Sequence, residues 1–157
     1  MDKLNIHSKL KGIQSSLKAP KGQTNKFGGY AYRSAEDILT AVKPLLAEWN
    51  CTLVITDDVV EVGGRIYVKA TAVLADPEGE YTVQACGFAR EADTRKGMDD
   101  SQITGSASSY ARKYALNGLF AIDDTKDADA TNDHGKKPLT PTKNKSQLAH
   151  ADAGFEF

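Results

Sequence analysis

The residues best suited to chemistry lie between Gly105 and Phe120, a segment of small, aromatic and basic side chains. On a helical wheel, one stripe holds Ala107, Tyr110, Ala111 and Tyr114, and the other side holds Gly105, Ser108, Ser109, Arg112 and Lys113. Small side chains allow a phosphate backbone to approach closely, and adjacent cations supply its countercharge. Taken alone, however, an adjacent Arg–Lys pair is more often the solvated face of a helix.

A second segment, Lys26 to Arg33, places two tyrosines between two cations. Proteins that bind single strands combine cations for the backbone with aromatic faces for the bases, and stacking contributes roughly 1–3 kcal/mol per base. The competing interpretation is that the aromatic residues anchor this loop to the core, since alternation places Tyr30 and Tyr32 on the same side. The sequence leaves both interpretations open.

Catalytic chemistry finds little support in the sequence. The three histidines lie in the flanks of the chain, so no core acid–base pair or Cys–His dyad is indicated. There is no phosphate-binding Gly-x-x-x-x-Gly-Lys-Ser/Thr sequence and no zinc-ligand cluster. The aspartates between 123 and 129 lack the glycine and the distal glutamate of a calcium loop. We therefore expect no catalytic residues, no metal and no cofactor.

Charge is distributed unevenly along the chain of 157 residues, whose net charge is −1. Residues 1–33 carry seven Lys or Arg against one acid, whereas residues 123–133 carry five aspartates against one lysine. A basic front suits a polyanionic partner, although solubility alone also explains charged helices and loops. No stretch approaches the roughly 18 apolar residues of a membrane helix, and no signal peptide or Cys-x-x-Cys pair is present. These features predict a reduced, cytoplasmic protein.

The periodicity of apolar residues predicts an α+β fold. Residues 4–18 and 102–117 have helical spacing, with a stop at Asn117-Gly118. Another helix begins after Ser34, an N-cap with Asp37 three residues later, and Pro44 predicts a kink or an early break in it.

Between these helices the spacing changes to that of strands. Residues 51–62 and 65–76 are joined by Gly63-Gly64, a hairpin signal, and a third strand covers residues 81–89. We therefore expect a three-stranded antiparallel meander packed with helices.

The last part of the chain loses apolar content. Residues 130–157 are predicted to form a disordered, flexible tail with an acidic and aromatic tip. Phe155 and Phe157 at this tip resemble the ends by which bacterial single-strand-binding proteins recruit partners, and an untethered polar tail is the alternative.

The residues of both segments resemble a known family. The run Gly105-Ser106-Ala107, Ser109 to Leu116, then Leu119, Ile122 and aspartates is similar to the signature of the ERF (essential recombination function) family of phage single-strand annealing proteins. Tyr30-Ala31-Tyr32 before Ser34, Asp37 and Ile38, followed by Pro44-Leu45-Leu46, is similar to the family's front half. The resemblance spans about residues 5–130. Two departures are Lys113, where the family often has arginine, and Gly118.

This resemblance implies an α–β–β–β–α core, similar to the eukaryotic strand-annealing recombinases, that assembles into rings or filaments. Residues 1–129 would form the DNA-binding and oligomerising core, acting in the cytoplasm of a bacterial host without ATP and without being an enzyme. Its partners would be single-stranded DNA, further copies of itself, and a host single-strand-binding protein or exonuclease, with no membrane involved. The candidate DNA-binding residues are Arg112, Lys113, Lys26, Arg33, Tyr30, Tyr32, Ser108 and Ser109.

The leading hypothesis is thus ATP-independent binding of single-stranded DNA and annealing of complementary strands in phage homologous recombination. One alternative is a module that coats single strands or recruits a host factor without annealing them. Another is a small hydrolase with an unrecognised site, against which the absence of a core histidine argues.

Overall fold

The computed structural model describes residues 5–26, 29–79 and 81–122. The elements in these residues are α1 (Ile6–Ser16), β1 (Gln23–Asn25), β2 (Tyr30–Tyr32), α2 (Ala35–Glu48), β3 (Thr52–Val62), β4 (Arg65–Ala75), β5 (Thr82–Arg90) and α3 (Asp100–Phe120). The predicted α+β class is confirmed. The division at residue 130 stays a prediction, because residues 123–157 lie outside the described residues.

The strands β3, β4 and β5 form an antiparallel sheet in which β4 is central, as the sequence predicts. Strand β3 pairs with β4 from Thr52–Ala75 to Val62–Arg65. The turn between them is Gly63-Gly64, whose φ angles are 59° and 71°. The two-residue turn that matches the twist of a hairpin requires a positive φ angle at both positions. Glycine adopts this conformation without strain, which explains the pair of glycines.

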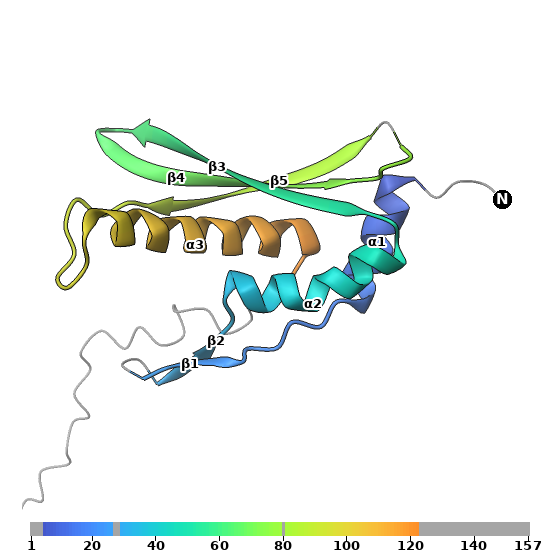
Figure 1. Ribbon diagram of the computed structural model, residues 1–157, viewed down its shortest axis with the longest axis horizontal. Coiled ribbons are helices and arrows are strands. Elements are labelled where there is room, and N and C mark those ends of the chain that lie inside the picture. The colour runs from blue at the N-terminus through green and yellow to red at the C-terminus, as the bar shows by residue number, and fades with distance from the viewer. Residues whose placement is uncertain (1–4, 27–28, 80, 123–157) are drawn as a thin grey trace, which may run out of the picture. The chain divides into compact units, whose positions relative to one another are not determined.

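All three helices lie on one side of this sheet (Figure 1). The inward residues of β4 are Val68, Ala70, Ala72 and Leu74, each at most 2% exposed. They pack with the buried residues of the helices into one core, which also contains Ile6, Leu10, Ile13, Ala35, Ile38, Val42, Cys51, Ala107, Ala111, Ala115, Leu116, Leu119 and Phe120. Among the described residues, no helix or strand covers the other face of the sheet.

Helix α3 packs directly on strand β5 at Gly87. A Cβ atom at this position would lie 2.2 Å from the carbonyl oxygen of Ala111 and 2.4 Å from the amide nitrogen of Ala115. Only a residue without a side chain fits so close to a helix backbone. Gly87 and the two alanines therefore set how α3 is placed on the sheet.

Helix α2 begins as predicted but does not break at proline. Ser34 accepts a hydrogen bond from the amide of Asp37 (3.1 Å), and Asp37 accepts one from the amide of Ser34 (2.8 Å), which completes the capping box. The helix continues through Pro44 to Glu48. The turn after Pro44 is retained because its apolar side chains, among them Leu45 and Trp49, pack against the core.

Helix α3 is longer than the sequence predicts at both ends. It begins after Asp99, whose side chain accepts a hydrogen bond from the amide of Gln102 (2.8 Å). The expected stop at Asn117-Gly118 is wrong, since the helix runs to Phe120 and closes at Ala121 with φ 50°. Glycine inside a helix costs about 1 kcal/mol. Burying Leu119 and Phe120 to 3% and 1% exposure contributes more, at roughly 1.5–3 kcal/mol each.

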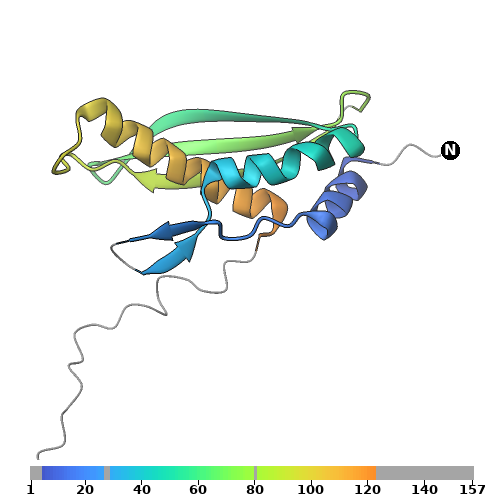
Figure 2. The same cartoon turned by 60° about the horizontal axis from the view of Figure 1, so that its bottom comes forward.

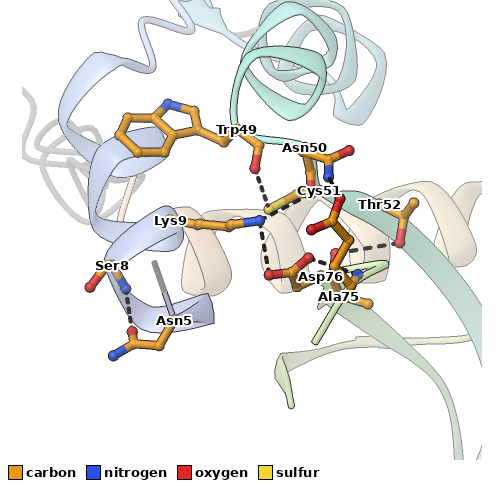
Figure 3. A network of polar contacts seen from close by, with 10 residues as sticks. Asn5, Ser8, Lys9, Trp49, Asn50, Cys51, Thr52, Ala75 and Asp76 are labelled. Atoms are coloured by element: carbon orange, nitrogen blue, oxygen red, sulfur yellow. Dashed lines mark hydrogen bonds and ion pairs between the residues drawn. The ribbon is translucent and has the colours of Figure 1, made fainter. Parts of the chain in front are cut away.

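An ion pair fixes α1 to the end of the sheet (Figure 3). Lys9 Nζ lies 2.8 Å from Asp76 Oδ2, and the two side chains are 12% and 11% exposed. The hydrogen bond from Lys9 to Asp76 raises the pKa of the lysine above its ordinary value, so the ammonium stays charged.

Gly12 of α1 packs against the indole of Trp49. A Cβ atom at Gly12 would lie 2.2 Å from the indole ring, so glycine leaves the room that the ring needs.

The segment predicted as a loop between Gly22 and Gly29 contains a strand. Residues Gln23–Asn25 pair with Tyr30–Tyr32 in a two-stranded antiparallel sheet of their own. This hairpin lies on the side of the helices that faces away from the three-stranded sheet (Figures 1 and 2). In the described part of the chain, no helix has the length and apolar character needed to cross a membrane.

Candidate nucleic-acid interface

Arg112 and Ser108 from α3 meet at one carboxylate on the edge strand β3. The Arg112 Nε–H donates to both oxygens of Asp57 at 3.0 Å, and Arg112 Nη2 lies 3.0 Å from Asp57 Oδ2. The hydroxyl of Ser108 donates to the same Oδ2 at 2.5 Å. A phosphate that binds Arg112 therefore has to compete with Asp57.

The ion pair shifts the pKa values of both of its members. Partial burial alone would raise the pKa of Asp57, but the hydrogen bonds from Arg112 and Ser108 outweigh it and hold that pKa below its ordinary value. The hydrogen bond to Asp57 raises the pKa of Arg112, although partial burial opposes the shift. Both groups are charged near neutral pH, and the pair attaches one flank of α3 to β3.

Lys113 and Ser109, the other two predicted residues on α3, are not part of this cluster. Ser109 is exposed and Lys113 is half-buried. Lys113 Nζ lies 5.7 Å from the centre of the Tyr114 ring, a cation–π distance. Within the described residues Lys113 forms no ion pair, so its charge remains available to an anion.

The front segment is not gathered at the same place. Lys26 is exposed in the turn after β1, whereas Arg33 is only 7% exposed and so does not present its guanidinium at the surface. Tyr32 is half-buried. The side chain of Tyr30 lies outside what the structure describes, as do the two tail residues Phe155 and Phe157.

A groove between β5 and α3 brings together residues that are not among the candidate DNA-binding residues predicted from the sequence. Its volume is about 310 Å³, and it is lined by Phe88, Ala89, Arg90, Ala92, Arg95, Ile103, Ser106, Ala107, Tyr110 and Tyr114. Its three aromatic side chains are half exposed: Phe88 50%, Tyr110 49% and Tyr114 47%. The lining contains two arginines and no carboxylate. We call this surface the β5–α3 groove.

Two signals in the sequence point to this groove. Alternation along β5 places Phe88 and Arg90 on the face opposite to Ala89, which packs against the core. On α3, Tyr110 and Tyr114 are four residues apart and lie on one flank, whereas Ala107 and Ala111 of the same predicted stripe are buried. The helical wheel correctly places these four residues on one side of the helix. It does not show which of them are buried against the sheet and which remain exposed.

The groove offers charges and aromatic faces, and it does not suggest a metal centre. Among the described residues, no group of three or more His, Cys, Asp or Glu is arranged to hold a metal ion. Fold and site together define a small α+β protein with helices on one face of its sheet and an aromatic, cationic groove along one sheet edge.

The chain belongs to the ERF superfamily, whose family model matches residues 6–153. It is 51% identical over 138 residues to the Essential recombination function protein of Salmonella phage P22, an alignment that covers 88% of this chain and 65% of that protein. The chain thus spans somewhat less than two thirds of that relative's length. No solved structure matches it. The family inferred from the two sequence segments is confirmed.

Proposed function

We propose that this chain binds single-stranded DNA and anneals complementary strands, without ATP, in phage homologous recombination. Membership of the ERF superfamily and the recombination function in the name of the P22 relative support this proposal. The structural observation that carries it is the β5–α3 groove, which is lined by three half-exposed aromatic residues and two arginines.

Annealing is a binding reaction in which no covalent bond is made or broken. The protein has to neutralise two polyanionic strands and leave their base-pairing edges accessible. Arg90 and Arg95 in the groove and Lys113 beside it supply cations that form no ion pair within the described residues. Each phosphate they neutralise releases counterions and strengthens binding. In this proposal Arg112 acts mainly through Asp57, by holding α3 in place.

A single groove of this size contacts few nucleotides, so we propose that the core acts as a homo-oligomer, a ring or filament. Both edges of the three-stranded sheet, β3 and β5, are unpaired within the described residues, and such edges favour association. Many weak sites in a row then hold a strand by avidity. We further propose that the tail recruits a host single-strand-binding protein or an exonuclease.

The assay for this function mixes complementary oligonucleotides, one carrying a dye and the other a quencher, in EDTA and without nucleotide. The protein should accelerate quenching at least tenfold over the spontaneous rate. Arg95→Ala should reduce the acceleration, whereas Lys43→Ala, an exposed lysine on α2 outside the groove, should not. Binding without acceleration would instead indicate the coating or recruiting module. No binding to either strand would exclude both functions.

Sedimentation with and without oligonucleotide tests the proposed assembly. We expect species larger than the 16.9 kDa chain at micromolar concentration. A monomer under both conditions would contradict it.

A further inference from the structure

We propose that Tyr110 and Tyr114 form a stacking platform for unpaired nucleobases in the β5–α3 groove. This inference rests on the proposed function, because it assigns the non-electrostatic part of single-strand binding to two particular side chains. Their exposure is the first argument: an amphipathic helix buries its aromatic residues by default, yet both rings are about half exposed, at 49% and 47%.

The geometry of the two rings favours a planar ligand. Their centres are 6.3 Å apart and their planes are inclined by 35°, so the two rings are not stacked face to face on each other. Phe88 of the neighbouring strand also lines the groove, and alternation along β5 directs its side chain to the open face of the sheet. A groove of about 310 Å³ has the size of the smaller pockets that hold organic ligands. Base stacking on such rings is tolerant of sequence, because every base has a π face.

The charges around the rings favour a polyanion as the occupant, although Asp93 lies beside Arg90 in the adjoining hollow. The lining holds Arg90 and Arg95 and no carboxylate, and Lys113 lies over the ring of Tyr114. A single strand with its bases on the rings and its phosphates on these cations satisfies both features. A second copy of the chain would have to bring apolar or acidic groups here, and that occupant is one outcome of the test below.

The helix backbone that carries the two rings is anchored on the sheet, so binding a base does not require α3 itself to become ordered. Ala107, Ala111 and Ala115 form the buried face of α3. On the flank opposite to the tyrosines, Arg112 and Ser108 bind Asp57 of β3. The two tyrosines therefore project from the open flank of a helix that is anchored on its other side.

The test compares two ligands that differ only in their bases. Affinity is measured by fluorescence anisotropy for an oligothymidylate and for an abasic strand with the same number of phosphates. The wild-type chain should prefer the oligothymidylate. Tyr110→Leu and Tyr114→Leu should each weaken that affinity about 5-fold to 150-fold, the equivalent of roughly 1–3 kcal/mol of stacking. Affinity for the abasic strand and the slope of log affinity against log salt should stay unchanged.

Matched variants separate stacking from other roles. Tyr110→Phe and Tyr114→Phe keep the π face and should bind like wild type. Tyr81→Leu removes an aromatic residue that is 74% exposed outside the groove, and it should have no effect.

Three results would overturn the stacking platform. The first is an equal loss of affinity for both ligands in the Leu variants, and the second is no loss of affinity for either ligand. Both results would leave single-strand binding itself intact. A loss of oligomer size in the Leu variants, measured by sedimentation, would assign the groove to a second copy. If the wild-type chain bound neither ligand, the proposed function itself would fail.

Discussion

Replacing Gly87 with alanine tests how α3 is placed on the sheet. The new Cβ would lie 2.2 Å from Ala111 O and 2.4 Å from Ala115 N, where contacts below 3.0 Å are essentially never observed. Both clashing atoms belong to the helix backbone, so no rotamer change relieves them. The helix would have to withdraw from β5 by roughly 1 Å, which disrupts close packing along the interface.

The cost follows from this displacement. Overpacking a core by one methyl group typically costs about 1–3 kcal/mol. A clash with two backbone atoms belongs at the upper end, about 3 kcal/mol. Each kcal/mol shifts the Tm of a chain of this size by about 3–4 °C, so Gly87→Ala should lower Tm by about 10 °C. Because the groove is built on the same interface, single-strand binding should weaken as well.

The matched control is Gly105→Ala on the same helix. A Cβ at Gly105 meets no atom within 4 Å, and alanine is the better helix former. This variant should stabilise the protein by about 0.5–1 kcal/mol. Both changes are measured by thermal and urea unfolding. If Gly87→Ala were as stable as the wild type, the described contact between α3 and β5 would be refuted.

Four further predictions concern the groove, its anchor and the tail. Arg112→Met and Asp57→Asn should each lower the free energy of unfolding by about 1–2 kcal/mol, a value between those for exposed and for buried ion pairs. A double-mutant cycle should give a coupling energy of about 1 kcal/mol between the two residues. Strictly additive effects would contradict the ion pair. Because the folded-state pKa of Asp57 is lowered, its stabilisation should be complete near neutral pH and disappear as the pH falls from about 5 to about 2. The Tm values of the wild type and of Asp57→Asn should therefore converge over that pH range. A constant difference between the two Tm values would argue against the stabilisation by ionised Asp57. Lys113→Ala should flatten the slope of log affinity against log salt by about 0.7 for every sequence, and a wild-type slope would exclude this phosphate contact. Removing residues 150–157 should leave annealing intact and reduce capture of a host single-strand-binding protein, whereas equal capture would remove the proposed role of the tail.

Local patterns in the sequence predict much of the fold. Alternation along β4 identifies the buried face, and Gly63-Gly64 identifies the turn that sets the register with β3. The capping box at Ser34 likewise depends only on residues three positions apart. Each of these features is decided within a few residues, which explains why a single sequence reveals it.

The candidate site depends on contacts between distant residues, which such patterns do not contain. The sequence predicts that Arg112 binds a phosphate, but in the structure it pairs with Asp57. The two residues are 55 positions apart, so neither sequence segment alone reveals this ion pair. Similarly, the rotation of α3 on the sheet depends on its contact with Gly87. That rotation decides whether Tyr110 and Tyr114 are buried or lie open at the sheet edge.

The most direct test of the proposed interface is photocrosslinking to a single strand that contains 5-bromouracil, followed by tryptic digestion and mass spectrometry. A strand in the β5–α3 groove should crosslink to the peptides 97–112 and 114–126, which contain Tyr110 and Tyr114. Adding excess unlabelled single strand should abolish both adducts. Adducts confined to the peptide 27–33, or none despite measurable binding, would contradict the account.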